Sequence, residues 1–165
     1  MRDLKPILLV EDNPRDLELT LAALDKCQLA NDVVVARDGE EALALLTRRD
    51  PESGQPAWLP AVVLLDLKLP KVDGLEVLER VKSDPDTRHV PIVMLTASRE
   101  ETDLLRSYRH GVNAFVVKPV NFKDFFQAIR DLGVFWAIVN EPPVGCARRP
   151  QPAGAPMESE TGKGA

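Results

Sequence analysis

The stretch from Ala61 to Pro70 constrains the fold of this chain more than any other segment. Five apolar residues, Ala61 to Leu65, run without interruption into Asp66, and Pro70 ends the segment. A short apolar run bounded by turn residues is typical of a strand buried on both faces, as in a parallel sheet under helices. Asp66 then lies at the carboxyl edge of the sheet, where ligands bind in such folds. A single acid at a strand end is nevertheless more often a turn or cap residue.

Strand-like and helix-like patterns alternate along the rest of the chain. Apolar runs predict strands at residues 7–10, 33–36, 61–66, 91–96 and 114–117. Residues that commonly cap helices precede the patterns of helical spacing, namely Asn13, Asp38, Asp73, Ser98 and Asn121. Five strands alternating with five helices predict an α/β protein. The expected architecture is a (βα)5 three-layer fold whose five-stranded parallel sheet has the flavodoxin-like order 2-1-3-4-5.

Size and composition indicate one domain with a terminal extension. The chain has 165 residues, and we expect residues 5–136 to form the domain. Residues 137–165 are rich in Pro, Gly and charge, so we expect an extension whose distal part is disordered. About 30 residues are too few for an effector domain, and the net charge of −5 argues against a nucleic-acid partner. We therefore expect no DNA-binding domain, and output through surface contacts.

Neither a targeting segment nor a stretch of transmembrane length is evident in the sequence. The two cysteines, Cys27 and Cys146, are far apart and lack the spacing of metal ligands, which indicates free thiols. These features predict a cytoplasmic protein with no membrane association.

Polar side chains follow four of the five predicted strands, at the point where each strand ends. They are Glu11 and Asp12, then Asp66, Thr96 and Lys118. Because the carboxyl ends of parallel strands share one edge, we expect these side chains to meet there. Each of them alone has an ordinary explanation as a cap, turn or surface residue. Their joint occurrence in this order makes coincidence improbable.

The chemistry of this set favours phosphoryl transfer. Three clustered carboxylates repel one another and need a cation, and oxygen ligands from few side chains suit Mg²⁺. A carboxylate beside the metal can be the nucleophile that forms an aspartyl phosphate. The charge on the phosphoryl oxygens would be met by Mg²⁺, by the Lys118 ammonium, and by the Thr96 hydroxyl with nearby backbone N–H groups.

These residues resemble the receiver domain of two-component response regulators, the CheY-like family. The resemblance rests on residues 9–13 (LVEDN), 65–70 (LDLKLP) with Asp73–Gly74, 95–97 (LTA) and 117–119 (VKP), and it extends over nearly the whole expected domain. It implies a signalling phosphoacceptor rather than an enzyme acting on a separate substrate. Asp66 would accept a phosphoryl group from the phosphohistidine of a histidine kinase.

The resemblance also implies roles for the neighbouring residues. Asp12 and Asp66 would bind Mg²⁺ directly, together with the backbone carbonyl of Lys68, and Glu11 would act through water. Lys118 and Thr96 would contact the phosphoryl group, with Thr96 and Phe115 acting as switch residues. The Lys118–Pro119 peptide would be cis. The residues with implied roles are Glu11, Asp12, Asp66, Lys68, Thr96, Phe115 and Lys118.

Finer features resemble the single-domain regulators that are paired with bacterial phytochrome kinases. They are the long loop at residues 50–60, the start of the last helix at residues 118–121, and the ending Phe135–Trp136. This resemblance implies a bacteriophytochrome-type histidine kinase as the partner.

The aromatic residues suggest a second interaction surface. Seven of the eight lie between Tyr108 and Trp136. We expect Phe122, Phe126 and Ile129 to form the core-facing side of the last helix, which leaves other aromatics exposed. We predict a two-fold homodimer through the fourth helix, fifth strand and fifth helix, with the proximal extension at the interface. The predicted interface residues are Tyr108, Phe125, Phe135 and Trp136.

Two other classes of protein are alternatives to a receiver domain. A haloacid-dehalogenase-type phosphatase also uses an aspartyl nucleophile after a strand, but it places a second Asp two residues later as general acid, and Lys68 stands there. A nucleotide- or flavin-binding module needs a Gly-rich turn after the first strand. The acidic residues 11–14 (EDNP) would repel a phosphate instead.

Overall fold

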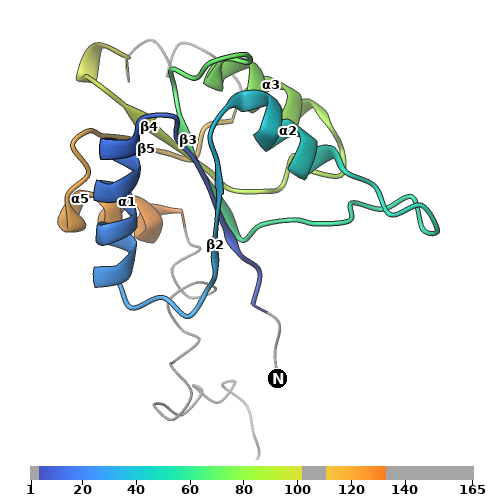
Figure 1. The fold of residues 1–165 in the computed structure, drawn as a ribbon, viewed down its shortest axis with the longest axis horizontal. Helices are drawn as coiled ribbons and strands as arrows, with labels where there is room; N and C mark the ends of the chain where they lie inside the picture. The colour runs from blue at the N-terminus through green and yellow to red at the C-terminus, as the bar shows by residue number, and fades with distance from the viewer. Residues whose placement is uncertain (1–3, 102–110, 133–165) are drawn as a thin grey trace, which may run out of the picture.

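The computed structural model describes residues 4–101 and 111–132 (Figure 1). Its strands are β1 (Ile7–Val10), β2 (Val33–Ala36), β3 (Val62–Asp66), β4 (Ile92–Thr96) and β5 (Ala114–Val117). Its helices are α1 (Pro14–Lys26), α2 (Gly39–Thr47), α3 (Gly74–Ser83) and α5 (Phe122–Asp131). The predicted fourth helix begins at residues 99–101, and its remainder lies outside the described residues. In the described part of the chain, no helix is long and apolar enough to span a membrane.

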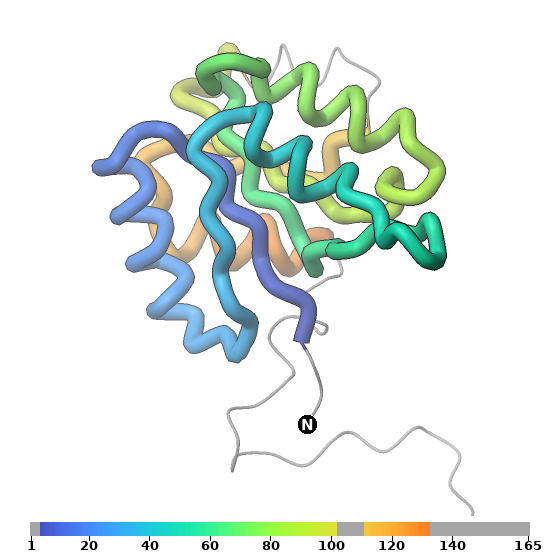
Figure 2. Tube along the Cα trace, turned by 45° about the vertical axis from the view of Figure 1, so that its right-hand side comes forward, coloured from blue at the N-terminus to red at the C-terminus, as the bar shows by residue number. Residues whose placement is uncertain are grey.

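The five strands form one parallel sheet in the order β2-β1-β3-β4-β5, which confirms the predicted fold class. In Figures 1 and 2, α1 and α5 cover one face of the sheet, while α2 and α3 cover the other. Alternate residues of β1 point to opposite faces of the sheet. Leu8 and Val10 pack towards α2 and α3, and Ile7 and Leu9 pack towards α1 and α5. The three central strands are buried throughout, as their continuous apolar runs predict.

Each described helix begins directly after a capping side chain. The caps of α1, α2, α3 and α5 are Asn13, Asp38, Asp73 and Asn121, and each accepts a backbone N–H of the first turn. For α1, the Asn13 Oδ1 atom lies 2.9 Å from the backbone nitrogen of Arg15. The cap therefore leaves only residues 11–13 between β1 and α1, so Glu11 and Asp12 remain at the carboxyl edge of the sheet.

Two glycines fix the loop that follows β3. A Cβ atom on Gly74 would overlap the carbonyl oxygens of Asp66 and Leu67, and one on Gly39 would overlap that of Val72. The Gly74 N–H also donates a hydrogen bond of 3.0 Å to the Leu67 carbonyl. The chain leaving the sheet at Asp66 is thus packed against backbone on both sides, where only glycine fits.

The exposed side of α5 differs from the prediction. Phe125 is 1% exposed and packs with Ala128 and Ile129 in the core shared with α1, whereas Phe122 is 42% exposed. The predicted exposure of Phe125 and the predicted burial of Phe122 are therefore both wrong. Docking onto β5 and α1 selects the helix face at positions 125, 128 and 129, and a helix with aromatics on two sides does not reveal that choice. Phe122 instead stacks on Phe126 with ring centroids 5.3 Å apart.

The other predicted interface residues, Tyr108, Phe135 and Trp136, lie outside the described residues, as does the extension 137–165. The loop at residues 50–60 is described, and Trp58 packs onto the core beneath α2 and α3. This contact pins the loop to the domain.

The two phenylalanines provide a test of the packing of α5. Phe125→Ala should lower the free energy of unfolding by about 3–5 kcal/mol, because it leaves a cavity in the core. Phe122→Ala, on the exposed side of the same helix, should lower it by less than about 1 kcal/mol. Urea denaturation followed by circular dichroism measures both changes. Equal losses in the two variants would contradict this packing.

Candidate functional site

Three carboxylates meet between β1 and β3, which are neighbours in the sheet. Glu11 and Asp12 follow the last residue of β1, and Asp66 is the last residue of β3. One carboxylate oxygen from each of the three lies within 4.8 Å of the others. Glu11 and Asp66 are buried, while Asp12 is exposed. The sequence-predicted acids are therefore brought together at the predicted edge.

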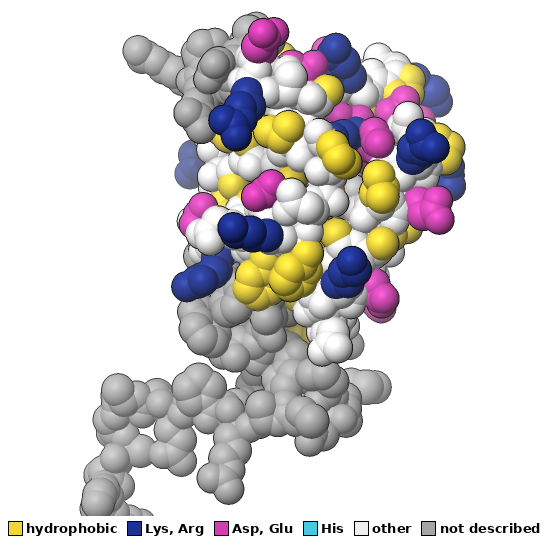
Figure 3. All heavy atoms as spheres, turned by 90° about the vertical axis from the view of Figure 1, so that its left-hand side faces the viewer, with side chains coloured by type: hydrophobic (Ala, Val, Ile, Leu, Met, Phe, Trp, Pro, Cys, Tyr) yellow, Lys and Arg dark blue, Asp and Glu magenta, His cyan; other side chains and the backbone are white. Residues whose placement is uncertain are grey.

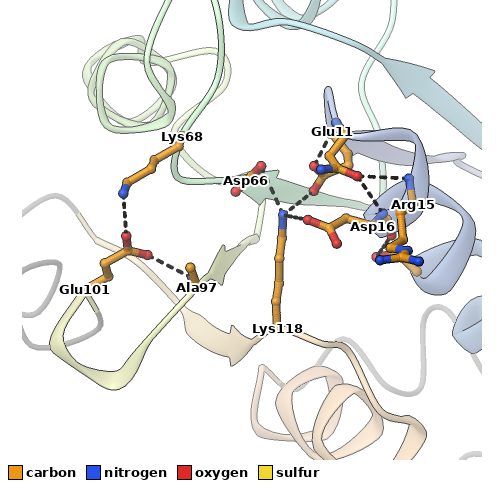
Figure 4. A network of polar contacts seen from close by, with 10 residues as sticks. Glu11, Arg15, Asp16, Asp66, Lys68, Ala97, Glu101 and Lys118 are labelled. Carbon is orange, nitrogen blue, oxygen red and sulfur yellow. Dashed lines mark hydrogen bonds and ion pairs between the residues drawn. The ribbon is translucent and has the colours of Figure 1, made fainter.

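The Lys118 side chain reaches this acid cluster from the end of β5 (Figure 4). Its Nζ atom lies 3.1 Å from Asp66 Oδ2, 2.7 Å from Glu11 Oε2 and 2.9 Å from Asp16 Oδ2. The Lys118–Pro119 peptide is cis, as predicted. One ammonium thus faces three carboxylates.

Burial and charge shift the proton affinities of this cluster. Burial raises the pKa of Glu11 from 4.5 to about 7, against the lowering effect of Lys118. Burial likewise raises the pKa of Asp66, and again Lys118 opposes it. Burial alone would lower the pKa of Lys118, but its carboxylate partners outweigh that effect and raise the pKa. The acids thus have less positive charge around them than their burial demands.

The donor set fits a divalent cation. Among the described residues, the buried Oε2 atom of Glu11 has no hydrogen-bond donor in good geometry. Its one charged partner there is the Lys118 ammonium. Its other oxygen, Oε1, accepts the Asn13 N–H at 3.1 Å. Three convergent carboxylates with oxygen ligands only are typical of Mg²⁺ sites. The Lys68 backbone opposes the rise in the pKa of Asp66, and the role of the Lys68 carbonyl as a metal ligand stays a prediction.

The predicted switch residues lie on the two strands beyond Asp66. Thr96 ends β4 and is fully buried, and its hydroxyl donates to the Ser98 carbonyl at 3.3 Å. Phe115, on β5 opposite Met94, is half-buried against the core beneath α2 and α3. Thr96 thus ends the strand next to β3, while its contact with a group on Asp66 and the movement of both residues stay predictions.

Sequence reasoning missed two acids that join the site. Asp16 forms an ion pair with Lys118 from the first turn of α1, and its closeness in sequence to Glu11 and Asp12 could have indicated this. Glu101 accepts the Ala97 N–H at 2.8 Å and pairs with Lys68 at 3.2 Å. The sequence shows Glu101 as part of a helix-capping pattern with Ser98, and nothing in that pattern points to Lys68.

Comparison with known proteins agrees with this geometry. A family model described as the response regulator receiver domain matches residues 7–130. Response regulator Rcp1 of Synechocystis sp. is 39% identical over 132 residues, which cover 80% of this chain and 88% of Rcp1. A solved structure of Rcp1 in its Mn²⁺-bound form has a TM-score of 0.61 at 38% identity, covering 80% of this chain and 92% of that one.

Two solved bacteriophytochrome response regulators are more similar. AtBRR is 70% identical with a TM-score of 0.75, covering 85% of this chain and 100% of its own. RtBRR is 60% identical with a TM-score of 0.76, covering 86% of both chains. With a matched family model over most of its length and these relatives, the chain belongs to the response regulator receiver domain family.

Proposed function

We propose that this protein is a stand-alone response regulator that accepts a phosphoryl group on Asp66 from a histidine kinase. The observation that carries the proposal is the position of Asp66, which lies among two further carboxylates and 3.1 Å from the Lys118 ammonium. The protein would act as a phosphoacceptor that catalyses only its own phosphoryl transfer and slow dephosphorylation. Its signal would be a change in the surfaces that contact other proteins.

In the proposed transfer, a carboxylate oxygen of Asp66 attacks the phosphorus of the kinase phosphohistidine. An O–P bond forms as the N–P bond breaks, and its electron pair returns to the imidazole, which takes up a proton. No separate general base is needed, because the nucleophile is an ionised carboxylate. Lys118 would neutralise one phosphoryl oxygen, and the Thr96 hydroxyl would donate to another.

Glu11, Asp12 and Asp66 would hold Mg²⁺. Bound there, the cation would supply positive charge both to the acids and to the phosphoryl oxygens. The Mn²⁺-bound form of the relative Rcp1 supports a divalent cation in this family. The raised pKa of Glu11 supports it for this chain, because that acid lacks sufficient positive charge when Lys118 is its sole partner of that sign among the described residues.

We further propose a bacteriophytochrome-type histidine kinase as the partner, in the cytoplasm. The support is the similarity to AtBRR and RtBRR, whose names state that they are bacteriophytochrome response regulators. The match covers 100% of the AtBRR chain, so the similarity extends over all of that solved chain.

Output through a homodimer is the remaining part of the proposal. Figure 3 views the molecule from the side of α1 and α5, where hydrophobic side chains gather between charged ones. Leu19 and Phe122 are each 42% exposed, and Phe122 stacks on Phe126. An aromatic surface on α5 is available to a second copy of the chain, together with the sequence-predicted contacts of Tyr108, Phe135 and Trp136.

The phosphoacceptor can be identified by intact mass. Wild type incubated with acetyl phosphate and Mg²⁺ should gain the mass of one phosphoryl group, stable in acid and labile to hydroxylamine. Asp66→Asn should gain none, whereas Asp25→Asn, an exposed acid on α1, should be labelled like wild type. Label that survives in Asp66→Asn, or its absence from wild type, would contradict the proposal.

The affinity for Mg²⁺ should depend on pH through Glu11. Below its pKa of about 7, Glu11 is mainly protonated and a proton competes with the metal. The apparent affinity should therefore rise about tenfold between roughly pH 6 and pH 8, as measured by isothermal titration calorimetry. Glu11→Gln should weaken binding and flatten this dependence. A pH-independent affinity in wild type would show that Glu11 does not take part.

The homodimer predicts a mass that depends on concentration. Multi-angle light scattering should show wild type moving from the monomer mass towards twice that mass as concentration increases. Trp136→Ala should shift the equilibrium towards monomer, because it removes an apolar contact. A strict monomer in both proteins would refute the dimer.

A further inference from the structure

The Glu101 carboxylate joins two loops that leave neighbouring strands (Figure 4). Its Oε2 atom accepts the Ala97 N–H at 2.8 Å, just after β4. Its Oε1 atom lies 3.2 Å from the Lys68 Nζ atom, just after β3. In a simple capping box, the acid would instead return to the N–H of the cap residue, Ser98. Glu101 thus acts between loops as well as within its own turn.

Strand register places both partners of Glu101 at the carboxyl edge of the sheet, just beyond Asp66. Asp66 pairs with Leu95 across β3 and β4. Lys68 and Ala97 are each two residues beyond that pair, one after β3 and one after β4. The Ala97 N–H also follows Thr96 directly, so it is the backbone donor next to the hydroxyl proposed to contact the phosphoryl group. Glu101 therefore occupies the Ala97 N–H, a backbone donor that a phosphoryl group on Asp66 could use, and it also pairs with the Lys68 ammonium.

The strengths of the two contacts are consistent with a reversible arrangement. The Lys68 side chain is 80% exposed, so its ion pair with Glu101 is weak and screened by solvent. The Ala97 hydrogen bond is charge-assisted and stronger. That bond is the first cause of the lowered pKa of Glu101, which keeps the side chain ionised at neutral pH. A phosphoryl group carries more negative charge than one carboxylate and can displace it.

We propose that Glu101 is an internal competitor of the phosphoryl group. Before phosphorylation, its carboxylate holds the Ala97 N–H and the Lys68 ammonium; a phosphoryl group on Asp66 takes over the Ala97 N–H and expels Glu101. The inference rests on the proposed function, since it requires phosphorylation of Asp66. Glu101 is a positioning residue here, because it acts through the donors and not on the reacting atoms. Its release changes residues 97–101, the segment that leads from β4.

Phosphorylation rates provide the first test. Initial rates with acetyl phosphate and Mg²⁺ should increase about three- to tenfold in Glu101→Gln, because a neutral amide competes less well for the Ala97 N–H. Glu100→Gln is the matched control. Glu100 is the adjacent, exposed acid, and its substitution makes the same change in net charge. Its rate should stay within about twofold of wild type, as is usual for a surface acid screened by solvent.

The outcomes separate this inference from the proposed function. If wild type is not labelled on Asp66, the proposed function fails and this inference fails with it. If wild type is labelled but Glu101→Gln is no faster than Glu100→Gln, the inference alone is overturned. A similar gain in both variants would assign the effect to net charge and would also overturn it.

The Ala97 amide gives a readout that a merely structural role would not change. In ¹H–¹⁵N spectra, beryllium fluoride with Mg²⁺, a phosphoryl mimic, should shift the Ala97 resonance of wild type. Glu101→Gln alone should also shift it, and the two proteins should agree at Ala97 once the mimic is bound. The proposed competition would be overturned if the mimic left the Ala97 resonance of wild type unshifted. It would also be overturned if the Ala97 resonances of the two proteins differed as much with the mimic bound as without it.

Discussion

The Lys118 ammonium is the interaction on which the charged edge of this fold depends. It lies within 3.1 Å of oxygens from Glu11, Asp16 and Asp66, two of which are buried. One positive charge does not balance three negative ones, and burial raises the pKa values of Glu11 and Asp66 against the opposing effect of Lys118. The deficit of positive charge makes the cluster a good host for a divalent cation. Structure and proposed chemistry thus share one cause, which is insufficient positive charge at the carboxyl edge of the sheet.

The sheet and its edge could be predicted because their signals are local. The residues of β1, β2 and β5 agree with the predicted bounds, since continuous apolar runs end there in charged or turn residues. Capping side chains place the described helix starts for the same reason. Parallel topology then gathers the strand-end residues without any further information. Glu11, Asp66 and Lys118 therefore lie in contact as the sequence predicts.

The buried face of α5 and the pairings of Asp16 and Glu101 were not predicted, because they depend on tertiary contacts that local sequence patterns do not encode. Both Phe122 and Phe125 belong to apolar sides of α5, and only docking onto the sheet decides that Phe125 is buried. Asp16 and Glu101 look like ordinary acids in first helical turns. Their partners Lys118 and Lys68 come from distant segments, and long side chains make such pairings difficult to infer from spacing.

The loops after β3 and β4, on either side of Asp66, are held by different kinds of interaction. This difference decides which of the two loops would move when the charge at Asp66 changes. After β3, Gly39 and Gly74 let backbone pack on backbone, so movement there would break close contacts. After β4, the contacts described for residues 97–101 each involve a side chain: those of Thr96, Ser98 and Glu101. Side-chain contacts can be exchanged for others at small cost in free energy. A negative group added at Asp66 would therefore leave the loop after β3 in place and rearrange the one after β4.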